Sequence, residues 1–385
     1  MILKELIDSF FSGIENKAKS NYFSFKLAFL LMTISWILVF PKWPTLIHDY
    51  VTWQTVFLKS RDLTNSLTHI EPFWGHAKKV FRLTVPVLIR LFSLNVYSVL
   101  FIQSIIGYLI LVLCFELSNR IVIDKVQAVL FTSGIAFTYF GRVAFFDVNY
   151  TFFDAFSYFF LLLAMYNNNL FLIFIFSSMA AWNDERGFLA LGIVFLFHFF
   201  SKRNFEKVNS LSLRLSPQCI GILSSIFTYI ILRVFLSWKF NMHTPSDGAN
   251  ISMWSRTCTY MPIGMLSFLE GYWLLIIVSL TISFYNRDIV FIVSLLICLI
   301  LFVVVAGSVT DITRSGSYVV PILFVAIGYL KSRLPIFEMR VLLLISFVFS
   351  LLIPQVFICP DWEMYSVFYN SISAVRKFGL YLLNH

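Results

Sequence analysis

The segment LFLIFIFSSMAAWNDERGFLALGIVFLFHFF, residues 170–200, decides how this chain folds. It holds two apolar runs, 170–182 and 187–200, separated by the polar block Asn-Asp-Glu-Arg at 183–186. Two apolar helices joined by a tight polar turn are the simplest structure for this pattern. Asn183 or Asp184 can cap the second helix, and acids suit its positive end. The block is therefore either a solvated turn or the wall of a site.

The rest of the chain repeats this apolar character. Of its 385 residues, 59% are hydrophobic and 13% are charged, with a mean hydropathy of +0.83. A soluble core of this length could not absorb so much apolar surface, because charged residues usually make up about a quarter of a soluble domain. In lipid every backbone polar group needs an internal partner, so the apolar runs are expected to be helices. The composition predicts an all-α polytopic membrane protein.

The apolar runs predict about eleven transmembrane helices, several of them short, including 152–166 and 170–182. Lys and Arg in the short loops place the N-terminus in the cytoplasm, although the first outer loop is an exception with seven basic residues. We expect a single membrane domain, 1–385, without a soluble domain. Its segments outside the spans are a cytoplasmic amphipathic helix within 1–24, a first outer loop with short interfacial helices at 41–92, a second outer loop at 238–262 and a C-terminal segment at 359–385.

Two other features exclude or limit function classes. The net charge is +9, but the basic residues are scattered at segment ends rather than gathered on one face, which argues against nucleic-acid binding. The five cysteines form no metal or redox motif. Cys258 and Cys359 fall in predicted outer loops, where a disulfide would form if that side is oxidising.

Acidic residues gather at the outer ends of the predicted helices. Ionisable groups at membrane depth cost about 2.5 to 3.5 kcal/mol each, so they usually face a cavity or a partner. Each has a simpler alternative role as a helix cap, as a local ion pair such as Asp311 with Arg314, or as part of a solvated turn. His48 is more typical of a hydrogen-bonded loop residue than of a metal ligand. The acidic set is Asp49, Asp147, Asp154, Asp184, Glu185, Asp311 and, near the outer end of its span, Glu270.

Five segments together resemble the GT-C superfamily of membrane glycosyltransferases over roughly residues 25 to 330. One departure is His48-Asp49 in place of an Asp-Glu pair, and another is the absence of a large C-terminal soluble domain. The compact size is similar to bacterial or phage enzymes that decorate surface polysaccharide. The segments are IHDYVTWQTVF (47–57), FRLTVPVLIRLF (81–92), FFDAFSYFFLLLAM (152–165), WNDERGFLALG (182–192) and TDITRSGSYVVPILF (310–324).

This resemblance implies transfer of a sugar from a polyprenyl-phosphate donor to a glycan or lipid-linked acceptor, with inversion, at the periplasmic face of a bacterial inner membrane. Asp49 would be the general base that takes the proton of the acceptor hydroxyl. Arginines suit the phosphate leaving group through their planar fork, and Arg314 and Arg186 are the candidates for this role, with Arg82 behind them. Some members use a divalent metal, and the sequence does not decide whether this chain does. The expected substrate-binding residues are His48, Arg82, Asp154, Asp184, Glu185, Arg186, Asp311 and Arg314.

Three other functions stay open at this level. A polysaccharide polymerase or ligase would act on similar lipid-linked glycans, usually through a large outer loop with several arginines. A transporter or lipid flippase would be expected to show paired halves and broken helices at midplane. A structural scaffold would not need carboxylates gathered on one side of the membrane.

Overall fold

The computed structural model describes residues 2–38, 50–67, 79–146, 153–203, 205, 215–244, 254–255, 257–309, 311–353, 356–359 and 362–366. Nearly all of these described residues are helical. The helices are α1 (Ile2–Ala18), α2 (Phe23–Leu38), α4 (Tyr50–Arg61), α5 (Thr84–Phe92), α6 (Val96–Val122), α7 (Lys125–Ile135), α8 (Tyr139–Phe146), α9 (Asp154–Tyr166), α10 (Leu170–Asn183), α11 (Glu185–Ser201), α12 (Pro217–Phe240), α14 (Met261–Leu269), α15 (Trp273–Tyr285), α16 (Ile289–Gly307), α17 (Ile312–Gly316), α18 (Ile322–Lys331) and α19 (Ile336–Leu352).

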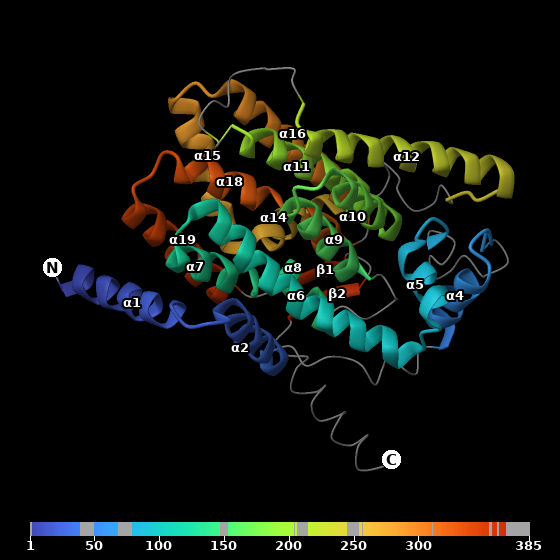
Figure 1. The fold of residues 1–385 in the computed structure, drawn as a ribbon, viewed down its shortest axis with the longest axis horizontal. Helices are drawn as coiled ribbons and strands as arrows, with labels where there is room; N and C mark the ends of the chain where they lie inside the picture. The colour runs from blue at the N-terminus through green and yellow to red at the C-terminus, as the bar shows by residue number, and fades with distance from the viewer. Residues whose placement is uncertain are drawn as a thin grey trace, which may run out of the picture.

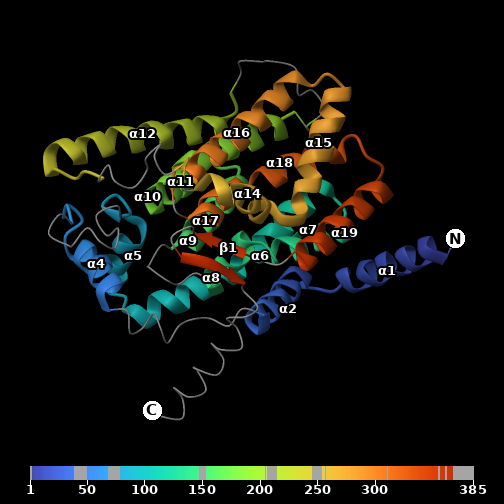
Figure 2. The same cartoon turned by 180° about the vertical axis from the view of Figure 1, so that it is seen from behind.

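Three 3₁₀ turns join some of these helices: η5 (Cys258–Tyr260), η6 (Glu270–Tyr272) and η7 (Ser317–Val319). Two short antiparallel strands, β1 (Val356–Cys359) and β2 (Trp362–Ser366), follow the last helix. Strand β1 packs against α14 and α17 (Figure 2). The strands therefore cover one side of the helical bundle.

Five of the described helical segments are long and apolar enough to cross a membrane. The pair α7 and α8 would make a sixth span, bent by 61° at its break. Three apolar helices are shorter, among them α9 and α10, which lie where the sequence predicts short spans. The chain is a helical integral membrane protein, and the count of about eleven spans stays a prediction. The five long segments are 96–122, 217–240, 258–285, 289–307 and 312–331.

The long apolar segments divide into a buried centre and an exposed rim. The segment 312–331, which contains α17 and α18, is buried throughout, whereas the most apolar stretch of α12 is only 28% buried and that of α16 only 33%. The exposed apolar side chains of these rim helices face away from the core, so lipid is their natural solvent. Figure 1 shows α12 running along one edge of the bundle, with α4 and α5 beside its far end.

Helix α1 confirms that the N-terminal segment is helical, and it extends to Ala18 (Figure 1). Phe11 is buried against the bundle, while Leu6 and Phe10 are exposed. Arg340 of α19 stacks over the Phe11 ring and donates to Asp124 Oδ2 at 2.7 Å. These contacts attach one side of α1 to the start of α7 and to α19. Its position at a membrane surface stays a prediction.

The described cysteines differ in burial. Cys114, Cys219 and Cys298 are buried, and Cys258 is an exposed free thiol. The side chain of Cys359 lies outside the described residues, as do His48, Asp49 and Asp147.

Candidate functional site

The polar block between the two apolar runs is a buried turn. Asn183 and Asp184 are each at most 2% exposed, and Arg186 is 8% exposed. Asp184 ends α10 and caps α11, accepting a hydrogen bond from the Arg186 backbone N–H at 3.0 Å. The Asn183 amide donates to the Phe153 carbonyl at 2.8 Å. The expected cap is confirmed, and the solvated-turn alternative is wrong because neighbouring helices cover the turn.

Three guanidinium groups surround the Asp184 carboxylate. Arg186 Nε lies 2.7 Å from Oδ1, and Oδ2 accepts from Arg82 Nη2 at 3.0 Å and from Arg314 Nη2 at 3.2 Å. Burial would raise the pKa of Asp184, but the coulombic attraction of Arg186, Arg82 and Arg314 outweighs it and holds that pKa well below its usual range. Asp184 is therefore an ionised anchor that ties together α11, α17 and the turn before α5.

Asp154 is the second anchor of the same network. Arg314 donates to both of its carboxylate oxygens, with Nη2 at 2.9 Å from Oδ1, and the Tyr318 hydroxyl donates to Oδ1 at 2.7 Å. Asp154 is the first residue of α9, whose N-cap is Phe153, and the hydrogen bonds of its carboxylate come from the side chains of Arg314, Tyr318 and Tyr139. The alternative role of Asp154 as a helix cap is therefore wrong, because its carboxylate faces Arg314.

The structure thus brings together most of the expected site residues from distant parts of the sequence. Asp311 pairs with Arg314 at 3.3 Å, as its i,i+3 spacing indicated. The second guanidinium that the sequence assigned to a donor phosphate, that of Arg186, also donates to Ser315 Oγ at 2.8 Å. Because Arg186 and Arg314 are buried in these contacts, they organise the network rather than present their charge to a cavity.

A narrow cavity beside this network has a cationic wall. Lys59, Lys79 and Arg82 line it together with the amide of Asn183. Its volume is about 20 Å³, room for about one water molecule, so a larger anion would require the flexible lysine side chains to move. Its other lining residues are Thr55, Val56, Leu67, Val85, Pro86 and Phe153. Arg82 belongs both to this wall and to the Asp184 network.

Lys59 is buried in this wall, with its ammonium donating to the Asn65 carbonyl at 2.6 Å. Burial lowers the pKa of Lys59 from 10.5 to about 8, with Asp62 opposing the shift. The pKa of Asp62 is itself lowered by hydrogen bonds from Thr64. Lys59 therefore loses its proton at a lower pH than a lysine in water.

The expected catalytic residue Asp49, and His48 before it, lie outside the described residues. Helix α4 begins at Tyr50, the next residue, which agrees with a helix expected from residue 50 onward. Thr55, Val56 and Lys59 of α4 line the cavity. The element that follows Asp49 in the chain therefore contributes one side of the cationic cavity.

Glu185 lies between two arginines. Its carboxylate is 3.8 Å from Arg82 Nε and 3.6 Å from Arg233 Nη1 on α12, and its side chain is one-third exposed. Glu185 and Arg82 were expected from the sequence, whereas Lys59, Lys79 and Arg233 were not. In the sequence, each of these three residues appears only as a cation inside or beside an apolar run. Such a pattern does not show which cavity the side chain reaches.

A second buried charge pair lies away from this network. Arg142 of α8 and Glu270 of η6 are each 3% exposed and attract each other electrostatically. The proximity of Arg142 agrees with Glu270 as a packing partner for a basic residue, and its alternative role as a site carboxylate stays a prediction. Within the described part of the chain, both amino nitrogens of Arg142 and the Oε2 atom of Glu270 have no hydrogen-bond partner.

The helices on which this pair lies are both broken. Arg142 follows the bent break between α7 and α8, and Glu270 begins the 3₁₀ turn between α14 and α15 with a positive φ of 48°. A positive φ is unusual for a residue with a long side chain. Two helix breaks therefore meet at one buried pair of opposite charges.

Over the ranges that the structure describes, no three His, Cys, Asp or Glu side chains gather in a way that would hold a metal ion. Comparison with known protein families, curated proteins and solved structures finds no match to this chain.

Proposed function

We propose that this protein is a membrane glycosyltransferase. It transfers a sugar from a polyprenyl-phosphate donor to a glycan or lipid-linked acceptor at the outer face of a bacterial inner membrane. The observation that carries the proposal is the cationic wall formed by Lys59, Lys79 and Arg82, which shares its cavity with the apolar side chains of Val56, Leu67, Val85 and Phe153. An anionic headgroup on an apolar chain is the ligand class that such surroundings favour.

The cationic wall suits a phosphate leaving group. When the donor's anomeric C–O bond breaks, negative charge develops on the phosphate, and preorganised cations stabilise that charge most in a water-poor site. Arg82 is held in place by its 3.0 Å contact with Asp184, which is itself fixed by Arg186 and Arg314. The buried network therefore has the role of positioning one cation of the wall.

Asp49 is the proposed general base. The acceptor oxygen attacks the anomeric carbon, the bond from that carbon to the phosphate oxygen breaks, and the acceptor proton passes to the Asp49 carboxylate. The products are the glycosylated acceptor and polyprenyl phosphate. Asp49 directly precedes α4, whose side chains line the cationic cavity, and this proximity in the chain supports its assignment.

The experiment uses purified protein and a polyprenyl-phosphate donor with a radiolabelled sugar. We expect release of polyprenyl phosphate together with labelled acceptor. Lys59→Met should lower kcat/KM by about ten- to a hundredfold, the loss expected for one charged contact to phosphate. Lys239→Met is the matched control, because Lys239 is exposed and lies outside the cavity. No donor cleavage by the wild-type protein under any acceptor condition would overturn the proposal.

Movement of an intact anionic lipid across the membrane is the second candidate function. It is favoured by the Arg142–Glu270 pair at two helix breaks, since discontinuous helices with buried charges are a feature of transporters. Liposomes with a labelled polyprenyl-phosphate sugar in one leaflet separate the two functions. Transfer cleaves the lipid from its sugar, whereas translocation moves the lipid without cleavage.

A further inference from the structure

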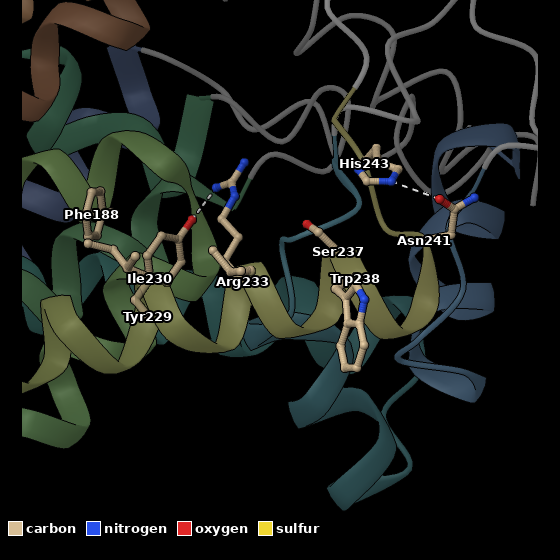
Figure 3. Close-up of a pocket in the computed structure, with 9 residues that line it drawn as sticks. Phe188, Tyr229, Ile230, Arg233, Ser237, Trp238, Asn241 and His243 are labelled. Carbon is tan, nitrogen blue, oxygen red and sulfur yellow. Dashed lines mark hydrogen bonds between the residues drawn. The ribbon is translucent and has the colours of Figure 1, made fainter.

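A large groove runs along one side of α12. It encloses about 820 Å³, within the usual range for ligand pockets, and extends from Tyr229 to Asn241. At the rise of a helix this stretch is about 18 Å long. Figure 3 shows Arg233 and Ser237 rising from one side of α12, whereas Trp238 points to the other. The remaining lining residues are Phe188, Ile230, Val234 and His243.

The groove is mostly apolar from Tyr229 to Val234 and polar near the end of α12, where Ser237, Asn241 and His243 line it, with Arg233 as a cation between the two parts. Five of its nine lining residues are aromatic or aliphatic: Phe188, Tyr229, Ile230, Val234 and Trp238. Among the lining residues, Arg233 carries a permanent positive charge. Its guanidinium stacks at 4.3 Å from the Phe81 ring centroid and donates to the Tyr229 hydroxyl and, at 3.0 Å, to Thr244 Oγ1. This arrangement fits an amphiphile better than a polar sugar chain.

The same helix is open to the bilayer. Its most apolar stretch is only 28% buried, and Ile230 and Val234 are 47% and 63% exposed. Trp238 is 80% exposed, near the end of the helix, where indole rings commonly lie at the membrane interface. A lipid chain can therefore reach the groove sideways from the membrane without crossing the packed core.

Glu185 connects the groove to the cationic cavity. Its carboxylate is within 4 Å of both Arg233, which lines the groove, and Arg82, which lines the cavity. Phe81, under the Arg233 guanidinium, is the chain neighbour of Arg82. An amphiphile whose chain occupies the groove would thus place its headgroup at the mouth of the cavity.

We propose that the α12 groove binds the isoprenoid chain of the lipid-phosphate substrate, with Arg233 at the junction between chain and phosphate. This inference rests on the proposed function, because the phosphate it delivers is the one that the cationic cavity receives. The groove then decides which chain lengths are accepted, since apolar contact grows with the length of chain laid along α12.

The test compares donors that carry a long or a short prenyl chain. Ile230→Trp fills the groove, and Ile231→Trp is the matched control, since Ile231 is similarly exposed on α12 but does not line the groove. We expect Ile230→Trp to raise KM for the long-chain donor about tenfold, the loss expected from roughly two buried methylene groups, and to leave the short-chain donor unchanged. The groove assignment would be overturned if Ile230→Trp raised KM equally for both donors. It would also be overturned if Ile231→Trp raised KM as much as Ile230→Trp.

A binding measurement separates failure of this inference from failure of the proposed function. Long-chain polyprenyl phosphate without a sugar, carrying a photoreactive group in its chain, should crosslink to α12 in the wild-type protein and much less in Ile230→Trp. Crosslinking without sugar transfer supports the groove and counts against the transferase. Sugar transfer without crosslinking to α12 overturns the inference. Crosslinking that excess phosphatidylglycerol or a soluble oligosaccharide abolishes equally well also overturns it.

Substitutions of Arg233 provide a second, independent test of the headgroup contact. Arg233→Met should weaken crosslinking of the polyprenyl phosphate, and Arg233→Lys should restore part of it, because a lysine keeps the charge but not the planar fork. A neutral polyprenol should crosslink equally to wild type and to Arg233→Met. If the neutral lipid loses as much crosslinking as the phosphate, Arg233 shapes the groove rather than binding the headgroup.

Discussion

Arg82 Nη2 lies 3.0 Å from Asp184 Oδ2, and this contact joins the turn before α5 to the turn between α10 and α11. Arg82 is separated from Asp184 by about a hundred residues of sequence, yet it lines the cationic cavity while Asp184 lies in the buried network. The contact therefore holds the Arg82 guanidinium in a fixed position at the wall of the cavity, where a ligand can reach it. This relationship leads to predictions about stability, catalysis and pH.

Asp184→Asn should destabilise the folded protein strongly. The substitution leaves three buried guanidinium groups without the carboxylate they share, and breaking a buried ion pair typically costs about 3–5 kcal/mol. Thermal unfolding in detergent measures the effect. Asp311→Asn is the control, since Asp311 is 24% exposed and contacts only the edge of the network through Arg314. Equal loss of stability in both variants would contradict the role assigned to Asp184.

Asp49→Asn should abolish sugar transfer without preventing membrane insertion. The amide cannot accept the acceptor's proton at neutral pH, although it keeps the size of the side chain. The measurement is labelled product formed by protein that elutes as a single species in detergent. Asp62→Asn, in the same part of the chain but on an exposed turn, is the control. Substantial transfer by Asp49→Asn would remove this residue from the catalytic role.

Lys59 should give both binding and stability a pH dependence near 8. Its pKa in the folded protein is about 8, against an ordinary value of 10.5, because burial disfavours the ammonium. As pH rises through 8, Lys59 loses its charge, so we expect the affinity for a phosphate lipid to fall.

The stability change has the opposite sign. Between pH 8 and 10.5 the unfolded chain binds the proton that folded Lys59 has released, so the free energy of unfolding should rise with pH in this window. Lys59→Met should remove both effects and be the more stable protein below pH 8. A pH profile unchanged by Lys59→Met would show that another group titrates.

Gly187→Ala should disrupt the packing of α11 against α9 and α10. A Cβ atom at Gly187 would collide with Ser157 Oγ of α9 and with the Ala180 carbonyl of α10. Gly192→Ala is a matched control in the same helix, because nothing lies within 4 Å of its added Cβ. We expect Gly192→Ala to stabilise the helix by about 1 kcal/mol and Gly187→Ala to lower the melting temperature. The same sign for both variants would contradict the close approach at Gly187.

Glu270→Leu should be much less stable than the double variant Arg142→Met/Glu270→Leu. The single change leaves a buried arginine without its counter-charge, whereas the double change replaces the pair by apolar side chains, which buried sites often tolerate. Unfolding temperatures of both singles and the double form the cycle. If the double variant folds and transfers sugar normally, the pair is structural; if it folds but no longer moves lipid across liposomes, translocation is supported.

The sequence by itself determined the class of protein and the local structure. Apolar runs of 13 or 14 residues on each side of Asn183–Arg186 left only helices as stable structures in lipid, and a cap at Asn183 or Asp184 located the break between α10 and α11. These features depend on neighbours in the chain, and for that reason they could be predicted. The catalytic assignment of Asp49 rests on a resemblance and stays a prediction.

Only the tertiary structure decided which charges meet. Asp154, Asp184 and Arg314 were all expected at helix ends on one side, but no local pattern shows that Arg314 bonds both carboxylates. No local pattern shows that Lys59 and Lys79 share a cavity with Arg82 either. Pairing over such separations in sequence depends on how helices pack and rotate, which is set by the sum of many apolar contacts. Asn183, Asp184 and Arg186, exposed in any local view of the sequence, are buried because Arg82 before α5, Phe153 before α9 and Ser315 of α17 contact them, whereas Glu185 stays one-third exposed.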